Sequence, residues 1–331
     1  MLKYIVKRLL LSILILLGVS LIIYILVRCM PYDFVTNKIS ALQSNSSFDP
    51  TAIENMYEMY GLSDSSFLGI LKGYANWLAA LCRFDFGKSF VHADSVLNVI
   101  VDHMGVSFAV AVIATIFEFM IAIPLGITAA THQYSLRDYI VTILVMVGIS
   151  LPSFFFGQIL KDAFAMKLGW FPPSGLVNAT QDHAGVVDLL IDYLRHMFIP
   201  ILTVVILSIG GRMRMTRTNM LEVLSSDYIR TARAKGLKEK VVIYKHAFRN
   251  TLIPLVTTLA GLLPSLFSGA IITEQVFDLP GIGNVAFKAM MQADIPFIMG
   301  YNMFLALLSV MGVLLADLMY VIVDPRVKLT K

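Results

Sequence analysis

Two acidic residues lie well inside apolar stretches of the chain and are its first candidates for chemistry, Glu118 and Asp317. An ionisable side chain is costly in hydrocarbon, so each acid is a functional hypothesis by default. Glu118 would favour a substrate's amino group or a cation if it faced a water-filled path. It would otherwise be a hydrogen-bonded residue between helices. Asp317 lies close to Asp324 at the end of its stretch, which favours a structural contact.

Other catalytic patterns are absent from the sequence. The six histidines form no HExxH or comparable pair, and no GxSxG nucleophile setting occurs. The chain also has no GxxxxGK[ST] phosphate loop, so it does not hydrolyse ATP by that route. We therefore predict that the chain by itself is not an enzyme and binds no metal or cofactor.

Composition places the chain among membrane proteins. Hydrophobic residues make up 57% of its 331 residues, charged residues only 15%, and the mean hydropathy is +0.77. The net charge of +4 comes from basic residues that flank apolar segments, which favours a lipid bilayer over nucleic acid as the partner. Cys29 and Cys82 are too few for a disulfide framework, and both a single bridge and two free thiols remain open.

Six apolar windows are long enough to be transmembrane helices, which predicts an all-α polytopic membrane protein. They lie at about 9–27, 104–130, 139–160, 197–211, 252–277 and 297–323, and the fourth is short. Most of the 26 lysines and arginines fall on one side and most of the 22 acids on the other. An excess of basic residues marks cytoplasmic loops, so both termini are predicted to be cytoplasmic, in a multi-pass inner-membrane protein.

These spans divide the chain into an N-terminal transmembrane helix (1–30), an extracytoplasmic helical loop region (31–103) and a transmembrane core (104–331) with a cytoplasmic loop at 212–251. The first helix is too long for a signal peptide and lacks a small-residue cleavage site. The region 31–103 contains helix-like stretches at 53–60 and 67–81. Tyr74 and Trp77 in the second stretch suit either a packed cap over the bundle or a partner surface.

The cytoplasmic loop holds a basic, amphipathic segment, MLEVLSSDYIRTARAKGL, at 220–237. Ser225, Ser226 and Asp227 are good N-cap residues and Gly236 is a good C-terminal stop, so Tyr228 to Lys235 is predicted to form about two helical turns. Such a helix is unstable alone and must pack against something. Tyr228, Ile229, Ala232 and Leu237 can share one side, and a second helix is expected from 238 or 239 to about 249. The alternative is a basic loop that meets anionic lipid.

Several stretches carry a family resemblance that spans the chain. YIRTARAKGL at 228–237 and KHAFRNTLIP at 245–254 resemble the cytoplasmic loop of the first permease of bacterial dipeptide and oligopeptide importers of the ATP-binding cassette (ABC) class. Stretches outside this loop match in the same order: MLKYIVKRLLLSI at the start, YGLSD at 60–64, DFGKS at 85–89, LGWFPPSG at 168–175, EQVFDLPGIG at 274–283 and YVIVDPRVKL at 320–329.

The resemblance implies a type I ABC importer permease fold and a short coupling helix that inserts into a groove on an ATPase subunit. The implied contact residues are Ser225, Ser226, Asp227, Tyr228, Arg230, Thr231, Ala232, Arg233, Ala234, Lys235 and Gly236. The wider class carries Glu-Ala-Ala where this chain has Arg230, Thr231 and Ala232, so no particular salt bridge is implied. Asp317 matches the acid of the family's terminal DLxY run, whereas Glu118 has no obvious match.

The implied partners are a second permease, two ATP-binding subunits that carry ATP and Mg, and an extracytoplasmic solute-binding protein. Two alternatives stay open from the sequence. One is an ATP-independent secondary transporter or channel. The other is an importer of the same family that carries nickel, glutathione or a peptide-like antibiotic.

Overall fold

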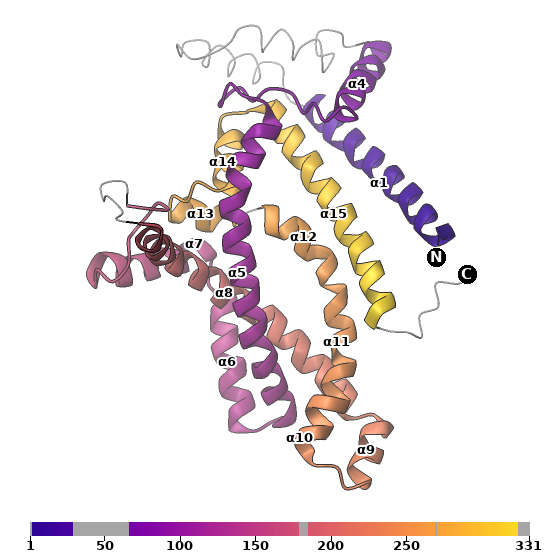
Figure 1. Ribbon diagram of the computed structural model, residues 1–331, viewed down its shortest axis with the longest axis vertical. Helices are drawn as coiled ribbons and strands as arrows, with labels where there is room; N and C mark the ends of the chain where they lie inside the picture. The colour runs from indigo at the N-terminus through magenta and orange to yellow at the C-terminus, as the bar shows by residue number, and fades with distance from the viewer. Residues whose placement is uncertain (1, 29–65, 179–184, 269, 324–331) are drawn as a thin grey trace.

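The computed structural model describes residues 2–28, 66–178, 185–268 and 270–323. Within these ranges the chain is built from helices, and its β pairing amounts to an isolated bridge between Lys88 and Ser95. The molecule is elongated, with α4 at one end and α9 and α10 at the other (Figure 1).

Four continuous helices of the described part are long and apolar enough to cross a membrane. They are α1 (Leu2–Arg28), α5 (Val96–Thr131), α8 (Val186–Leu224) and α15 (Ile295–Val323). A further candidate is a pair of helices bent by 102°, formed by α6 (Leu136–Ser150) and α7 (Ser153–Leu160), which continues as the π-helix η1 (Lys161–Lys167). Pro152 lies at the bend, where its ring disfavours a helical conformation of the preceding residue.

The predicted windows at 9–27, 104–130 and 297–323 are confirmed as parts of α1, α5 and α15. The short window at 197–211 is confirmed as part of a candidate membrane span, but the helix is longer, because 197–211 is the apolar middle of the 39-residue α8. The charged residues at both ends of α8 lower the mean hydropathy there, so a hydropathy window detects only its apolar middle. The window 252–277 is divided among α11 (Phe248–Thr257), α12 (Leu259–Ser268) and α13 (Ile271–Val276), with Pro254 and Pro264 inside the first two.

Helices α5 and α8 pack along much of their length and form the centre of the molecule. They lie close together at Gly126, where an added Cβ would lie 2.7 Å from Thr216 Cβ and 2.9 Å from the Met213 carbonyl oxygen. A larger residue at this point would push the two helices apart, so glycine is needed for their approach.

Helix α4 (Phe67–Leu81) has the bounds that the sequence predicts and packs on α1. Trp77 is fully buried and stacks on Tyr24 at 6.1 Å between ring centroids. The hydroxyls of Tyr74 and Ser20 lie 2.9 Å apart. These contacts support the packed-cap reading for Tyr74 and Trp77. The expected helix at 53–60 and Cys29 lie outside the described residues, and Cys82 is exposed.

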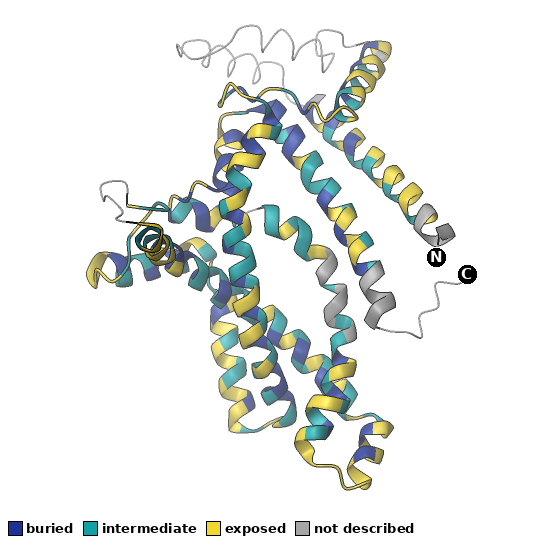
Figure 2. Cartoon of the chain, viewed as in Figure 1, coloured by how far each residue is buried: buried dark blue, intermediate teal, exposed yellow. Residues whose placement is uncertain are grey.

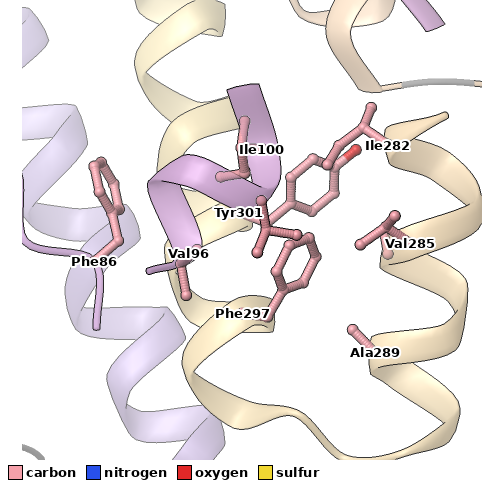
Figure 3. Packing of buried hydrophobic residues seen from close by; sticks show 10 residues of the cluster. Phe86, Val96, Ile100, Ile282, Val285, Ala289, Phe297 and Tyr301 are labelled. Carbon is pink, nitrogen blue, oxygen red and sulfur yellow. The ribbon is translucent and has the colours of Figure 1, made fainter. Parts of the chain in front are cut away.

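A hydrophobic cluster fastens the end of the molecule that carries α4. It joins the start of α5, helix α14 (Ile282–Met291) and the start of α15 (Figure 3). Its members include Phe86, Val96, Ile100, Phe297 and Tyr301. This end is therefore closely packed. Helices α1 and α6 instead carry many exposed residues along their length (Figure 2). The exposed residues include apolar ones such as Leu14 and Leu144, as lipid contact requires.

Candidate functional site

Helix α9 (Asp227–Ala234) is the predicted amphipathic segment, and it lies at the opposite end of the molecule from α4 (Figure 1). Ser226 occupies the N-cap position with extended backbone angles, φ −73° and ψ 152°, but its side chain does not cap the helix. Its hydroxyl donates instead to the Val223 carbonyl at 2.5 Å, and that of Ser225 donates to the Glu222 carbonyl at 2.8 Å. The expected side-chain cap is therefore wrong, because both hydroxyls bond back to the last turn of α8.

The C-terminal end of α9 follows the prediction. Gly236 has φ +74°, a left-handed conformation that favours glycine, and its N–H donates to the Arg233 carbonyl at 2.9 Å. The guanidinium of Arg233 then forms two hydrogen bonds with the Glu239 carboxylate, at 2.7 and 3.3 Å. The hydrogen bond from Arg233 lowers the pKa of Glu239, and the same contact raises the pKa of Arg233.

One face of α9 is buried in the bundle. Ile229 is fully buried and Ala232 is 6% exposed, in a cluster with Ile127 and Ala130 of α5 and Met220 of α8. Val242 and Ala247 of the π-helix η2 (Val242–Ala247) complete this cluster. The predicted apolar face is thus confirmed for Ile229 and Ala232. It is wrong for Tyr228 and Leu237, which are 45% and 40% exposed.

The opposite face of α9 is cationic and open. Arg230, Arg233 and Lys235 are all exposed, with 74% of the Arg230 side chain accessible. Thr231, Ala234 and Gly236 are exposed beside them, and Asp227 lies 3.5 Å from Arg230. The structure therefore brings the predicted contact residues together on α9 and its two ends, with an exposed side on which Arg230 lies beside Asp227 and Arg233 pairs with Glu239.

The second predicted helix of this loop is also present. It begins as α10 (Glu239–Val241), continues through η2 and extends beyond the expected end at Arg249 into α11. Asn250 donates from Nδ2 to the Tyr228 hydroxyl at 3.0 Å, so α9 is tied to this helix as well. The loop is a packed unit, with α9 held against α5, α8 and η2.

Asp317 takes the structural role that its position favours. Its Oδ1 accepts a hydrogen bond from an Nη atom of Arg8 at 3.0 Å, which joins α15 to α1. The two residues are 309 positions apart in the chain, so spacing gives no hint of this pair. A partly buried ion pair of this kind satisfies two charges that hydrocarbon would otherwise leave unpaired.

Glu118 combines the two readings that the sequence leaves open. It is 8% exposed, and its Oε1 accepts a hydrogen bond from Arg212 Nε at 3.0 Å, which links α5 to α8. Both residues also line a cavity of about 310 Å³ between α5, α8 and α12. Glu118 is therefore an interhelical residue that also faces a polar hollow.

The sequence does not single out a third acid, Glu274, which is fully buried in the structure. Its carboxylate accepts hydrogen bonds from the Ser107 hydroxyl at 2.7 Å and from the backbone N–H groups of Ala270 and Asn284 at 3.2 and 2.9 Å. An added Cβ at Gly281 would lie 2.6 Å from Ser107 Oγ and against the same carboxylate. Its position near the end of the apolar window 252–277 is the sequence signal that identifies it as a buried acid. This network fixes the EQVFDLPGIG stretch to α5.

Comparison with known families matches two adjoining parts of the chain. Residues 122–329 match the binding-protein-dependent transport system inner membrane component family, and residues 1–111 match the N-terminal part of such membrane components. The chain belongs to this family. It is therefore a helical, multi-pass inner-membrane component of a transport system, and α9 lies inside the matched region.

Relatives within the family match over the whole length. The oligopeptide transport system permease protein AppB of Bacillus subtilis is 36% identical over 329 residues, which cover 99% of this chain and all of that protein. The dipeptide transport system permease protein DppB of Alkalihalophilus pseudofirmus is 32% identical, over 99% of this chain and all of that protein.

Among solved structures, an inward-facing MetNI methionine ABC transporter matches with a TM-score of 0.54 at 16% identity. The match covers 69% of this chain and 97% of that one. This similarity places the chain in the ABC importer permease fold that the sequence predicts.

Proposed function

We propose that this chain is a permease subunit of an ATP-driven, binding-protein-dependent importer of di- or oligopeptides. The observation that carries the proposal is the end-to-end similarity to the oligopeptide permease of Bacillus subtilis. The dipeptide permease with equal coverage points to the same substrate class. In this proposal the chain forms the translocation path with a second permease and receives peptide from an extracytoplasmic solute-binding protein.

Helix α9 is the element through which ATP hydrolysis would act. In the described part of the chain, α9 is a short helix with one buried face and one exposed cationic face. Two ATP-binding subunits would carry ATP and Mg, and each would dock on the equivalent helix of one permease. The cationic residues Arg230, Arg233 and Lys235 suit carboxylates on such a partner.

Packing supports transmission from α9 into the bundle. Ile229 and Ala232 lie against the inner ends of α5 and α8, and these two helices line the cavity that holds Glu118. A movement of α9 would therefore shift the walls of that cavity. Switching between inward and outward openings needs a bundle with two packed arrangements and a ligand, here the ATPase, that binds them differently.

The proposal also fixes the orientation. The loop that carries α9 is rich in Lys and Arg and would face the cytoplasm, together with both termini. Helix α4 would then lie on the extracytoplasmic side, where the solute-binding protein approaches.

Reconstitution tests this function directly. Proteoliposomes that contain this permease, its second permease, the ATP-binding subunits and the binding protein should take up a labelled tripeptide only with hydrolysable ATP. The matched control is the same preparation with this chain alone, which should transport nothing. Peptide uptake by this chain alone, driven by an ion gradient, would instead establish a secondary transporter and overturn the proposal.

A further inference from the structure

The cavity between α5, α8 and α12 is lined by both polar and apolar residues inside an apolar bundle. Each helix contributes a hydroxyl, from Thr115, Ser208 and Ser265, and the charged groups are Glu118 and Arg212. At about 310 Å³ it has the size of a small-ligand site. Polar groups inside a membrane bundle are costly, so a lining of this kind points to a hydrated or polar occupant.

Chain direction places the charged pair at one end of this cavity. The lining residues of α5 run from Ser107 to Glu118 and those of α8 from Val204 to Arg212, both toward the end that carries α9. Ser107 lies at the opposite end of the lining, where it is held by Glu274. A solute that crosses the cavity from the α4 end therefore meets Glu118 and Arg212 last.

The pair has unused hydrogen-bonding capacity. Arg212 uses Nε on Glu118, and within the described residues neither of its Nη atoms donates a hydrogen bond. Oε2 of Glu118 likewise accepts none from the described residues. The guanidinium lies 4.7 Å from the centroid of the Phe119 ring, which holds its plane. Arg212 is also a lining residue of the cavity, so a ligand there lies beside a guanidinium whose two Nη groups donate to none of the described residues.

We propose that Arg212, held by Glu118, binds the C-terminal carboxylate of the peptide in the path; this inference rests on the proposed function. The two Nη groups present the parallel donors that match a carboxylate in bidentate geometry. Oε2 of Glu118 accepts an N–H of the same peptide. Glu118 also offsets the charge of Arg212, which keeps the site from holding an anion so tightly that it cannot leave.

The donor count favours the carboxylate over the ammonium end of a peptide. Two guanidinium nitrogens are open, against a single free oxygen of Glu118. An ammonium group would find this oxygen and neutral hydroxyls as its acceptors, and it would lie beside the like charge of the guanidinium. The hydroxyls of Thr115, Ser208 and Ser265 suit the neutral backbone amides of the peptide.

The test compares a tripeptide with a free C-terminus and its C-terminal amide, in the complete reconstituted importer with saturating binding protein. For wild type we expect the free peptide to be transported at about tenfold higher kcat/KM or more, the usual worth of a charge-assisted hydrogen bond. Arg212→Gln should lower the free-to-amide ratio about tenfold or more relative to wild type. Discrimination by the binding protein enters all variants equally, so the change in the ratio reports on the permease.

Two further variants keep the result interpretable. The double variant Glu118→Gln/Arg212→Gln leaves no unpaired charge in the cavity and should lose the preference in the same way. Arg214→Gln on the same helix is the matched control, because Arg214 contacts Met146 Sδ and is not a cavity residue; it should keep the wild-type ratio. If wild type transports both peptides equally, or both Arg212 variants keep its ratio, the subsite is wrong. Transport of neither peptide by wild type would overturn the proposed function itself.

Discussion

Shortening Ile229 to alanine should detach α9 from the bundle without disturbing its cationic face. The side chain is fully buried among Ala130, Met220 and Val242. Ile229→Ala removes three carbon atoms at about 0.8 kcal/mol each, and the cavity left behind raises the loss to about 3 kcal/mol. An eight-residue helix has little stability of its own, so this loss falls on local opening of α9 rather than on global unfolding.

Hydrogen exchange measures that opening. A loss of about 3 kcal/mol should raise the exchange rates of the amides at 227–236 by about a hundredfold, while those of α4 stay unchanged. The matched control is Arg230→Ala on the same helix, whose exposed side chain should leave exchange unaltered and weaken only ATPase docking. Equal protection of 227–236 in Ile229→Ala and wild type would refute the argument that Ile229 anchors α9.

Three further outcomes follow from the described contacts. Gly236→Val places a β-branched residue at φ +74°, which costs about 1–2 kcal/mol. It should abolish peptide-stimulated ATP hydrolysis by the complex without preventing membrane insertion. Lys240→Ala, at an exposed residue, is the control, and unchanged coupling in Gly236→Val would contradict a role for the C-terminal end of α9. Gly281→Ala brings a Cβ against Glu274 and Ser107, so it should reduce the free energy of unfolding by about 2 kcal/mol and lower the melting temperature in detergent. Gly261→Ala is the control, because a Cβ there meets open space, and it should leave the melting temperature unchanged. Equal melting temperatures of the two variants would contradict this prediction. Because Arg233 lowers the pKa of Glu239, their contact stabilises the folded loop above the ordinary carboxyl pKa near 4.5, and that contribution is lost as pH falls through the lowered pKa. The pair is exposed, so Glu239→Gln should remove at most about 0.5 kcal/mol from the stability of the loop at pH 7, and the difference from wild type should shrink as the pH falls below 4.5.

Local signals in the sequence predict the elements that local residues determine. Helix α4 has the predicted bounds, and α9 ends where Gly236 stops it. The apolar periodicity of α9 identifies Ile229 and Ala232 as its buried face. Tyr228 fails this prediction because its hydroxyl bonds to Asn250 at the surface, a contact that no helical pattern shows.

Long-range pairs limit what the sequence predicts about the polar residues. Glu118 and Arg212 are 94 positions apart, and Ser107 and Glu274 are 167 apart. Spacing within one helix does not reveal such partners, so Glu118 could be recognised as unusual but not paired. The predicted N-terminal side-chain cap of α9 fails for a local reason, because the hydroxyls of Ser225 and Ser226 bond to carbonyl oxygens three residues earlier, in the last turn of α8.

Photo-crosslinking from α9 tests most directly whether this helix is where an ATPase docks. A photoreactive phenylalanine analogue would replace Arg230 in the complete importer, and Leu144, an exposed apolar residue of α6, would be the control position. The proposed function predicts an adduct between position 230 and an ATP-binding subunit, and none from position 144. Absence of an adduct from position 230 in an assembled, transporting complex would contradict it.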